Sequence, residues 1–349
     1  MEKVKIGFVG CGYMGQLAHL PNFADSEKCK VVALAEKREK LGKAVAEKYH
    51  ISRLYTSHRQ LCEDEGIDAV VEITTDALHA PIALDCLNAG KHLFTEKPMA
   101  TTLADANRMV ESAEKNRVKL MVGYMKRYDP GVEKARQLVK EFISTGELGR
   151  VTFVRAHCFG GDWVCNIGKP ITTDETYPEV QANIPDWLPQ ELTKEFLGFN
   201  NVYCHNINLL RFFLGEIKEV KTAELGKSYP SGKVVVLDFG DFLGCLEVGG
   251  ISSRWWDEET KIYFEQGWIE LLTPPPLLKN VPAEVKVYKG GEIQQMLIPY
   301  SAWDWSFRRS AEHFLDCIIT DREPTSSGRD SREDMRIVEE IFRKYLMES

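Results

Sequence analysis

Short apolar runs alternate with helical periodicities over the first 123 residues of the chain. Continuous apolar runs of this length are typical of strands buried on both faces, and they occur at residues 3–9, 29–35, 69–73, 91–94 and 119–122. Apolar residues spaced by three and four predict helices between them, at residues 38–49, 81–89 and 103–116. This alternation predicts an α/β domain, a doubly wound parallel sheet with helices on both faces.

The pattern changes after residue 123. Helices are predicted at residues 130–144, 307–320 and 330–347. Strands with few helices between them are predicted at residues 151–158, 219–223, 233–239, 242–248, 262–264, 268–272 and 285–288. Such a series is typical of an open, mostly antiparallel sheet, and residues 160–199, with weak periodicity, are expected to form a loop. We therefore predict a first domain at residues 1–123 and an α+β domain at 124–349, whose last helices can pack back on the first.

Composition excludes several classes of protein. The 52 acidic and 44 basic residues give a net charge of −8, spread along the chain, so we expect no nucleic-acid partner, which a basic stripe would bind. The apolar runs are shorter than the roughly 20 residues of a membrane span, so we expect no membrane partner. Nine cysteines are scattered without a CxxC pair. They predict free thiols, a cytoplasmic location and no metal site.

A glycine motif follows the first predicted strand and opens a helix. It is GxGxxG, with glycines at Gly10, Gly12 and Gly15 and with Tyr13 and Met14 between the last two. Gly10 permits a tight turn, Gly12 lets a pyrophosphate approach the backbone, and Gly15 lets the helix pack close to the strand. The helix N-terminus then offers N–H groups to the diphosphate. The motif predicts a Rossmann domain that binds a dinucleotide through this turn.

The end of the second predicted strand bears on the choice of cofactor. Glu36 can accept both hydroxyls of the adenosine ribose, which favours NAD and repels the 2′-phosphate of NADP. Lys37 and Arg38 follow at once and can instead bind that phosphate. We expect NAD, with NADP as the alternative.

Further motifs follow in a characteristic order. They are TTDALH from Thr74, AGKH from Ala89, Glu96-Lys97-Pro98, KRYDP from Lys126, LGRV from Leu148, CHNIN from Cys204, Leu214-Gly215 and HFLDC from His313. With the glycine motif, they make almost the whole chain resemble the Gfo/Idh/MocA oxidoreductases, and Glu-Lys-Pro is the most specific element. The resemblance implies a nicotinamide-dependent enzyme that acts on a carbohydrate-like substrate.

The resemblance also implies roles for residues that follow the predicted strands. Thr74, Asp76 and His79 would contact the diphosphate and the nicotinamide ribose, although Thr75-Asp76 replaces the usual Pro-Asn there. Glu96 would hold the backbone or the carboxamide near the nicotinamide.

Two residues are the candidates for proton transfer. Lys97 would face the substrate hydroxyl and contact the cofactor, before a bond to Pro98 that is often cis in relatives. Oxidation of a secondary alcohol needs a group that removes the hydroxyl proton as the hydride leaves, and a lysine can do this. His205, expected in a helix at residues 204–213, would be the second catalytic residue.

The helix of His205 departs from the family pattern. Relatives commonly place Asp four residues before this histidine and three residues after it, whereas this chain has Asn201 and Asn208. An amide can orient a sugar hydroxyl but cannot take up a proton. Proton transfer would then depend on Lys97 and His205 alone.

Other side chains suit a polar substrate. Tyr124 and Arg127 can hydrogen-bond to it, and Arg127 can pair with a carboxylate or take part in a structural ion pair. Trp163 can stack on a sugar ring.

We therefore expect an NAD(P)-dependent dehydrogenase that acts on a secondary carbinol of a sugar, polyol or sugar acid. Apolar residues between Val234 and Val248 predict an exposed sheet face, which relatives bury in homodimers or homotetramers. Two alternatives remain, a redox-assisted glycosidase with tightly held NAD and a non-catalytic sensor of the same fold that binds nucleotide.

Overall fold

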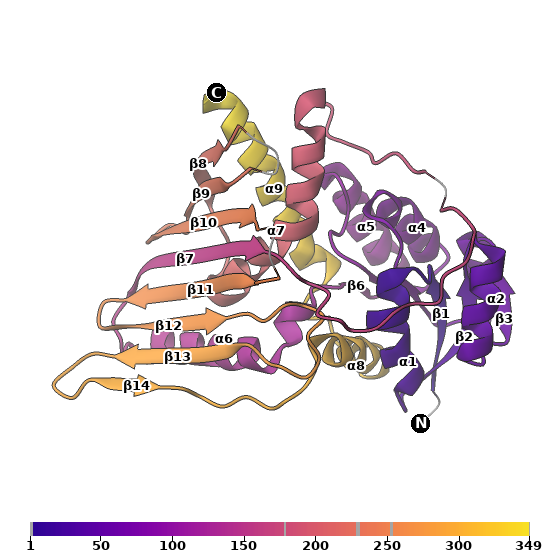
Figure 1. The fold of residues 1–349 in the computed structure, drawn as a ribbon, viewed down its shortest axis with the longest axis horizontal. Coiled ribbons are helices and arrows are strands. Elements are labelled where there is room, and N and C mark those ends of the chain that lie inside the picture. The colour runs from indigo at the N-terminus through magenta and orange to yellow at the C-terminus, as the bar shows by residue number, and fades with distance from the viewer. Residues whose placement is uncertain (1–2, 178, 228–230, 252–253, 349) are drawn as a thin grey trace. The chain divides into compact units, whose positions relative to one another are not determined.

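The computed structural model describes residues 3–177, 179–227, 231–251 and 254–348 (Figure 1). The chain divides into two compact units that are not contiguous in sequence. Unit 1 comprises Met1–Tyr124, Gly168–Trp187 and Phe307–Met335. Unit 2 comprises Met125–Ile167, Leu188–Ser306 and Arg336–Ser349.

Unit 1 contains a six-stranded parallel sheet in the order β3-β2-β1-β4-β5-β6. Its strands are β1 (Val4–Val9), β2 (Cys29–Ala35), β3 (Arg53–Tyr55), β4 (Ala69–Glu72), β5 (His92–Thr95) and β6 (Leu120–Val122). The doubly wound parallel sheet predicted from the sequence is confirmed. The prediction missed the edge strand β3. This strand has only three residues, and two of them, Leu54 and Tyr55, are too few to form a recognisable apolar run.

Helices flank both faces of this sheet. They are the π-helical turn η1 (Gly15–His19), α1 (Leu20–Asp25), α2 (Glu39–Lys48), α3 (His58–Cys62), α4 (Asp76–Asn88), α5 (Leu103–Asn116), α8 (Ser306–Ile319) and the first part of α9 (Gly328–Glu348). Gly7 of β1 lies against Leu61 of α3, whereas Phe8 contacts Phe23 of α1. Because consecutive strand residues point to opposite faces, α1 and α3 cover different faces.

Helix α4 begins earlier than its sequence suggested. We expected it to start at Pro81, but it starts at Asp76, after the extended residue Thr75, and Pro81 lies inside it. An acidic first residue such as Asp76 is favourable at the positive end of a helix. Asp76 was therefore a better indication of the helix start than Pro81. The earlier start brings Asp76 and His79 into the helix.

Aromatic rings form the core between the sheet and the helices α1 and α8. Phe94 of β5 packs edge-on against Phe23 and Phe314, with ring centroids 6.0 and 5.7 Å apart. Phe23 and Phe314 also contact each other, at 6.5 Å. All three side chains are fully buried. A helix close to the C-terminus therefore completes the core of the N-terminal sheet.

Unit 2 contains an eight-stranded sheet in the order β14-β13-β12-β11-β7-β10-β9-β8. Its strands are β7 (Val151–Gly160), β8 (Glu219–Leu225), β9 (Lys233–Asp238), β10 (Leu243–Gly250), β11 (Asp257–Phe264), β12 (Gly267–Leu272), β13 (Glu284–Lys289) and β14 (Gln295–Leu297). Neighbouring strands are antiparallel except β7 and β10, which are parallel. The mostly antiparallel sheet predicted for this part of the chain is confirmed.

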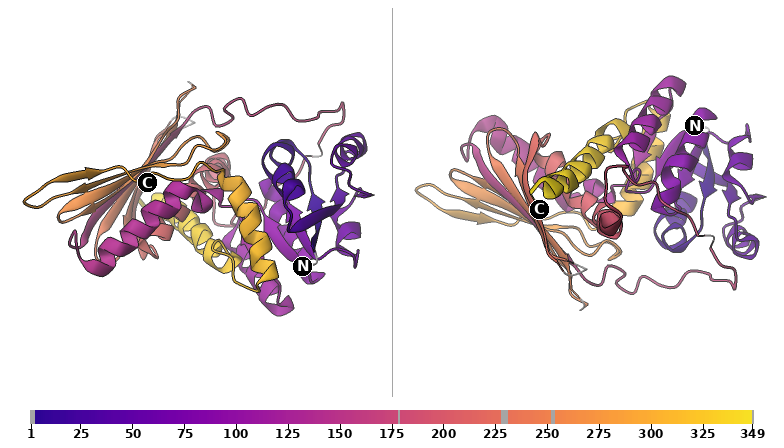
Figure 2. Two further views of the ribbon diagram at one scale, coloured as in Figure 1. Left: turned by 90° about the horizontal axis from the view of Figure 1, so that it is seen from below. Right: turned by 90° about the horizontal axis from the view of Figure 1, so that it is seen from above.

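One face of this sheet packs against helices (Figure 2). They are the 3-10 turns η2 (Met125–Tyr128) and η3 (Gln190–Leu192), with α6 (Pro130–Thr145), α7 (Thr193–Leu214) and the end of α9. Side chains of β9 and β10 alternate, so that Val235 and Leu246 are buried, whereas Val234 is 45% and Leu243 43% exposed. The exposed apolar face expected around Val234 is therefore present.

Helix α7 is longer than expected. It begins at Thr193 rather than at residue 204, so the expected loop at 160–199 ends before it. Phe196 and Phe199 of its first turns both pack against Phe342 of α9, with ring centroids 5.1 and 5.7 Å apart. This contact with a distant helix stabilises a segment whose own periodicity is weak.

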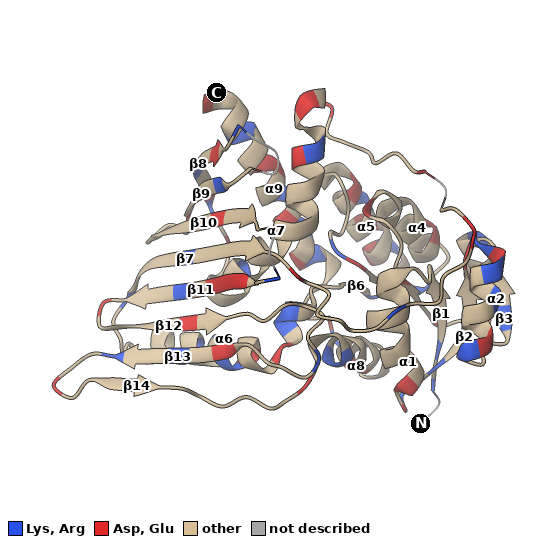
Figure 3. Cartoon of the chain, viewed as in Figure 1, with Lys and Arg blue, Asp and Glu red and all other residues tan. Residues whose placement is uncertain are grey.

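Charged residues and cysteines are distributed over both units of the described structure. Acidic and basic residues are mixed along the elements of both units (Figure 3). All nine cysteines are free and are buried or half-buried. Within the described residues, no helix has the length and apolar character needed to cross a membrane. In the same part of the chain, no group of three or more His, Cys, Asp or Glu side chains could hold a metal ion.

Truncation of Phe314 tests the aromatic core. Phe314→Ala should lower the free energy of unfolding by about 3–5 kcal/mol, because it leaves a cavity against Phe23 and Phe94. Ile143→Ala on the exposed surface of α6 is the control and should change it by less than about 0.5 kcal/mol. Urea unfolding followed by fluorescence measures both, and equal values would contradict the assigned core.

Candidate functional site

The glycine loop of unit 1 has the close contacts that its sequence predicts. Gly10 has a φ of +83°, and a Cβ there would lie 2.5 Å from the Ile73 carbonyl oxygen. A Cβ on Gly15 would lie 2.8 Å from the Gly10 carbonyl oxygen. Above Gly12, in contrast, the nearest atom is an Arg38 nitrogen at 3.9 Å. The loop is therefore closed against β1 and β4 and open at Gly12.

A dinucleotide fits this loop. The open position at Gly12 leaves space for a diphosphate beside the backbone, and Tyr13 and Met14 begin the helix that follows. N–H groups in the first turn of a helix have no partner within that helix and can bind phosphate oxygens. The residues present thus suit the cofactor that the fold implies.

Glu36 follows β2 and joins it to the glycine loop. Its side chain is buried, and one carboxylate oxygen accepts the Cys11 N–H at 2.9 Å. Arg38 Nε donates to the other oxygen at 2.8 Å. Burial raises the pKa of Glu36, but the hydrogen bonds from Arg38 and Cys11 outweigh it, so this pKa lies below its ordinary value. Glu36 is thus a charged group that positions the loop.

The ion pair also determines how Glu36 can bind a ribose. The carboxylate accepts four N–H groups, from Cys11 N and from Arg38 N, Nε and Nη2. A carboxylate has about four acceptor positions, so a ribose hydroxyl would bind in exchange for an Arg38 N–H. Lys37, also a cofactor candidate, has an exposed side chain.

Glu72, the last residue of β4, positions the next loop. It is fully buried and accepts the Thr74 N–H at 2.9 Å and the Thr95 hydroxyl at 2.6 Å. The Thr74 hydroxyl donates to it as well. Thr74, which the resemblance places near the diphosphate, is therefore oriented by a carboxylate beneath it.

Two further cofactor candidates lie in α4. Asp76 is the first residue of this helix, and His79 lies one turn later. His79 Nδ1 donates to the Pro98 carbonyl at 2.8 Å, whereas its Nε2 is buried and has no hydrogen-bond partner among the described residues. Burial lowers the pKa of His79, but the charges of Glu72 and Asp76 outweigh it, and this pKa is raised. Nε2 thus remains available for a polar ligand atom.

The Glu-Lys-Pro motif follows β5. Glu96 is buried, accepts a hydrogen bond from His19 Nε2 at 2.6 Å and also accepts the Lys97 N–H at 2.9 Å. Burial raises the pKa of Glu96, but His19 and Lys97 outweigh it and hold this pKa below its ordinary value. Lys97 is half-buried, and its peptide bond to Pro98 is cis, as the resemblance implied.

Three buried carboxylates therefore share one edge of the sheet. Glu36, Glu72 and Glu96 lie at the carboxyl ends of β2, β4 and β5, and each accepts the backbone N–H of a nearby loop residue. Sequence reasoning missed Glu72 and His19. A charged residue at the end of the apolar run of β4 was the available signal for Glu72. No sequence signal distinguished His19.

In unit 2, α7 brings three predicted residues to one helical face. Asn201, His205 and Asn208 are spaced by four and three residues. His205 is 9% exposed and Asn208 is 1% exposed. The two amides therefore lie one turn before and one turn after the histidine.

Arg127 and Asn208, both substrate candidates, contact each other. Arg127 Nε donates to Asn208 Oδ1 at 2.6 Å, and both side chains are buried. The guanidinium also lies over the Phe212 ring, 4.9 Å from its centroid. This amide joins η2 to α7.

Tyr124 and Trp163, the other substrate candidates, differ in exposure. Tyr124 is the last residue of the first segment of unit 1, and its side chain is buried. Trp163 follows β7 and is 42% exposed, and its carbonyl accepts the Leu277 N–H.

A second polar cluster in unit 2 was not foreseen from the sequence. Buried Glu258 of β11 pairs with Lys126 and accepts hydrogen bonds from Asn206 Nδ2 and Trp256 Nε1, both at 3.1 Å. Asn206 is the residue after His205, so this cluster anchors α7 to the sheet. Contacts between η2, α7 and β11 cannot be recognised from the spacing of one sequence.

The sequence of this chain is similar to that of known oxidoreductases. Residues 4–124 match a family described as an oxidoreductase family with an NAD-binding Rossmann fold. A myo-inositol 2-dehydrogenase of Thermotoga maritima is 30% identical over 276 residues, which cover 76% of this chain and 74% of that protein.

Two other similarities differ in extent. An inositol 2-dehydrogenase of Salmonella paratyphi B is 30% identical over 191 residues, 54% of this chain, and the match spans little more than half of that protein, 55%. The crystal structure of an aldose-aldose oxidoreductase from Caulobacter crescentus, complexed with glycerol, has a TM-score of 0.77. Its sequence is 22% identical to this chain, and the superposition covers 100% of this chain and 99% of that protein. This last likeness concerns the fold.

The lowered pKa of Glu36 predicts a dependence of stability on pH. The charged Glu36 contributes to the free energy of unfolding. This contribution is fully present above 4.5, the ordinary pKa of glutamate, and is lost as the pH falls through the lower pKa of Glu36 in the folded state. Glu36→Gln should therefore be less stable than wild type at pH 7, and the difference should shrink below about pH 4.5.

Urea unfolding at pH 7, 5, 4 and 3 measures this difference. Glu47→Gln on the exposed side of α2 is the control and should stay within about 0.5 kcal/mol of wild type throughout. A Glu36→Gln difference that did not change with pH would show that its charge does not stabilise the loop.

Proposed function

The chain belongs to the Gfo/Idh/MocA family of oxidoreductases, and we propose that it is a dehydrogenase acting on CH–OH groups. Hydride would pass between NAD and a secondary carbinol of a polyol, sugar or sugar acid. The observation that carries this proposal is the carboxyl edge of the parallel sheet, where the open glycine loop, Glu36 and Lys97 all follow strand ends. Ligands of open parallel sheets bind at this edge.

Each part of the cofactor has candidate partners at the edge. The turn at Gly10, Gly12 and Gly15, with Tyr13 and Met14, would hold the diphosphate, and Glu36 would accept the adenosine ribose hydroxyls. Thr74, Asp76 and His79 would contact the nicotinamide ribose, and Glu96 would hold the segment beside the nicotinamide. We propose NAD rather than NADP because the buried, charged Glu36 repels a phosphate.

The chemistry requires one proton to leave the substrate hydroxyl. Bound NAD supplies the hydride acceptor. Lys97 Nζ would take the proton as the carbon–hydrogen bond breaks, and we propose His205 of unit 2 as the second catalytic residue. Asn201 would orient a neighbouring hydroxyl. Asn208 holds Arg127, so we propose that this pair positions α7 and the substrate rather than binding a free carboxylate.

The substrate class and assembly extend this proposal. The Thermotoga and Salmonella relatives bear the names of inositol dehydrogenases, so a polyol is the first substrate to test. Tyr124 and Trp163 are the remaining candidates for contact with its hydroxyls. We propose residues 1–123 as the cofactor domain and residues 124–349 as the substrate and oligomerisation domain. A homodimer or homotetramer would cover the exposed face at Val234 and Leu243, and the free thiols suit a cytoplasmic protein.

Removal of the lysine amine tests the proposed role. Lys97→Ala should lower kcat by about 100-fold to 10,000-fold, because it removes the group proposed to take the hydroxyl proton, while NAD affinity should change much less. Reduction of NAD or NADP is followed at 340 nm with inositols, sugars and uronic acids, and NAD binding is measured by calorimetry. Lys115→Ala on the exposed side of α5 is the control and should retain wild-type turnover.

Several outcomes would contradict the proposal. Full activity of Lys97→Ala would exclude Lys97 as the base. Wild-type protein that binds NAD but reduces none across the panel would instead support the sensor or the redox-assisted glycosidase.

A further inference from the structure

An extended segment that follows β7 binds along the cofactor edge of unit 1. This strap, defined as residues 168–177, belongs to unit 1 although it is flanked in sequence by unit 2. Gln16, the residue after the last glycine of the loop, holds it by two hydrogen bonds. Its Nε2 donates to the Ile171 carbonyl at 3.0 Å, and its Oε1 accepts the Ile171 N–H at 2.8 Å. The same amide nitrogen donates to the Cys11 carbonyl, so the strap is fixed to the glycine loop itself.

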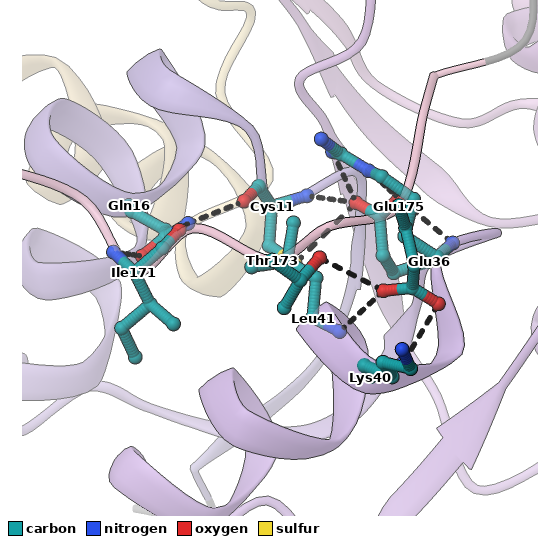
Figure 4. Close-up of polar contacts among 9 residues, drawn as sticks. Cys11, Gln16, Glu36, Lys40, Leu41, Ile171, Thr173 and Glu175 are labelled. Atoms are coloured by element: carbon teal, nitrogen blue, oxygen red, sulfur yellow. Dashed lines mark hydrogen bonds and ion pairs between the residues drawn. The ribbon is translucent and has the colours of Figure 1, made fainter.

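A second attachment lies at the start of α2, the helix that follows Glu36. The carboxylate of Glu175 accepts the backbone N–H groups of Lys40 and Leu41, both at 3.0 Å, and the Thr173 hydroxyl at 2.9 Å (Figure 4). Burial raises the pKa of Glu175, but these three donors outweigh it, so this pKa lies below its ordinary value. The strap therefore places a full negative charge on the positive end of α2.

The strap also holds the side chain of Arg38. The guanidinium lies over the ring of Tyr177, 5.0 Å from its centroid, while it donates two hydrogen bonds to Glu36. Arg38 is thus fixed between an acidic and an aromatic partner. To bind another anion, the Arg38 guanidinium would have to give up a contact with Glu36 or with Tyr177.

These are the groups that a 2′-phosphate on the adenosine ribose would use. In dinucleotide-binding folds, the acidic residue after the second strand binds the 2′-hydroxyl, whereas a nearby arginine accommodates the 2′-phosphate. Free N–H groups at a helix N-terminus also favour phosphate. Here Arg38 is paired with Glu36, and two N–H groups of α2 are taken by Glu175. The Arg38 guanidinium and these two α2 N–H groups are therefore already satisfied from within the chain.

We propose that Glu175 is a specificity-determining residue that excludes NADP by placing its own carboxylate where the 2′-phosphate would bind. The inference rests on the proposed dinucleotide site and adds a residue 139 positions beyond Glu36 to its selectivity. A phosphate entering there would meet a like charge and would have to displace three hydrogen bonds. NAD carries a hydroxyl at that position and does not compete with the carboxylate. Cofactor choice is therefore set jointly by the strand end and by the strap.

Calorimetric titration of NAD and NADP tests this role without any turnover. Glu175→Ala should strengthen NADP binding by about tenfold or more, because the α2 N–H groups then become available to phosphate, and should change NAD binding by less than about threefold. Glu175→Gln removes the charge but keeps an acceptor oxygen, and it should shift the ratio of the two dissociation constants in the same direction. Asp174→Ala is the matched control, because the Asp174 carboxylate accepts hydrogen bonds from the Lys40 side chain, at 2.7 and 2.9 Å, and it should leave the ratio unchanged.

The outcomes separate this inference from the proposed function. Wild-type protein that binds NAD, together with an unchanged ratio in both Glu175 variants, would overturn the role of Glu175 and leave the dinucleotide site intact. Wild-type protein that binds neither nucleotide would overturn the site and the inference with it. A wild-type preference for NADP would contradict the role of Glu175 directly.

Discussion

A carboxylate that is buried at the end of a parallel strand needs hydrogen-bond donors. Without them, the free energy of removing its charge from water is far larger than any single contact can offset. Unit 1 meets this requirement in the same way at the ends of three strands. Glu36, Glu72 and Glu96 each accept the backbone N–H of a residue in a loop at the sheet edge. The positions of Cys11, Thr74 and Lys97 are thereby fixed before any ligand binds. Preorganisation of this kind lowers the cost of holding a cofactor.

Buried polar groups have different kinds of hydrogen-bond partner in the two units. In unit 1, each of the three carboxylates accepts a backbone N–H besides its side-chain partners, so the charge also positions the loop that carries this N–H. In unit 2, side chains stabilise one another, as in Arg127 with Asn208 and Lys126 with Glu258. The family resemblance implied an aspartate at the position of Asn208, and here the neutral amide accepts a hydrogen bond from the buried guanidinium of Arg127. The substitution is therefore compatible with an ordered α7, the helix on which the proposed catalytic His205 lies.

The sequence predicted the parts of the fold that depend on local pattern. The apolar runs located five of the six parallel strands, and the glycine spacing located the turn after β1. It missed β3, which has three residues, and the first turns of α7, which are stabilised by Phe342 from the far end of the chain. Glu36 and the Glu-Lys-Pro motif were recognisable because each follows a predicted strand. The strap was not, since Glu175 reaches α2 through contacts across 134 residues or more that no periodicity encodes.

We propose above all that the carboxyl edge of the six-stranded sheet binds a nicotinamide dinucleotide. A crystal structure of the protein with NAD would show whether it does. We expect the diphosphate beside Gly12 and the adenosine ribose hydroxyls on Glu36, in exchange for Arg38 N–H groups. Glu175 should still accept the N–H groups of Lys40 and Leu41. An adenosine bound elsewhere, with the Glu36–Arg38 pair intact and no ligand contact to the glycine loop, would contradict it.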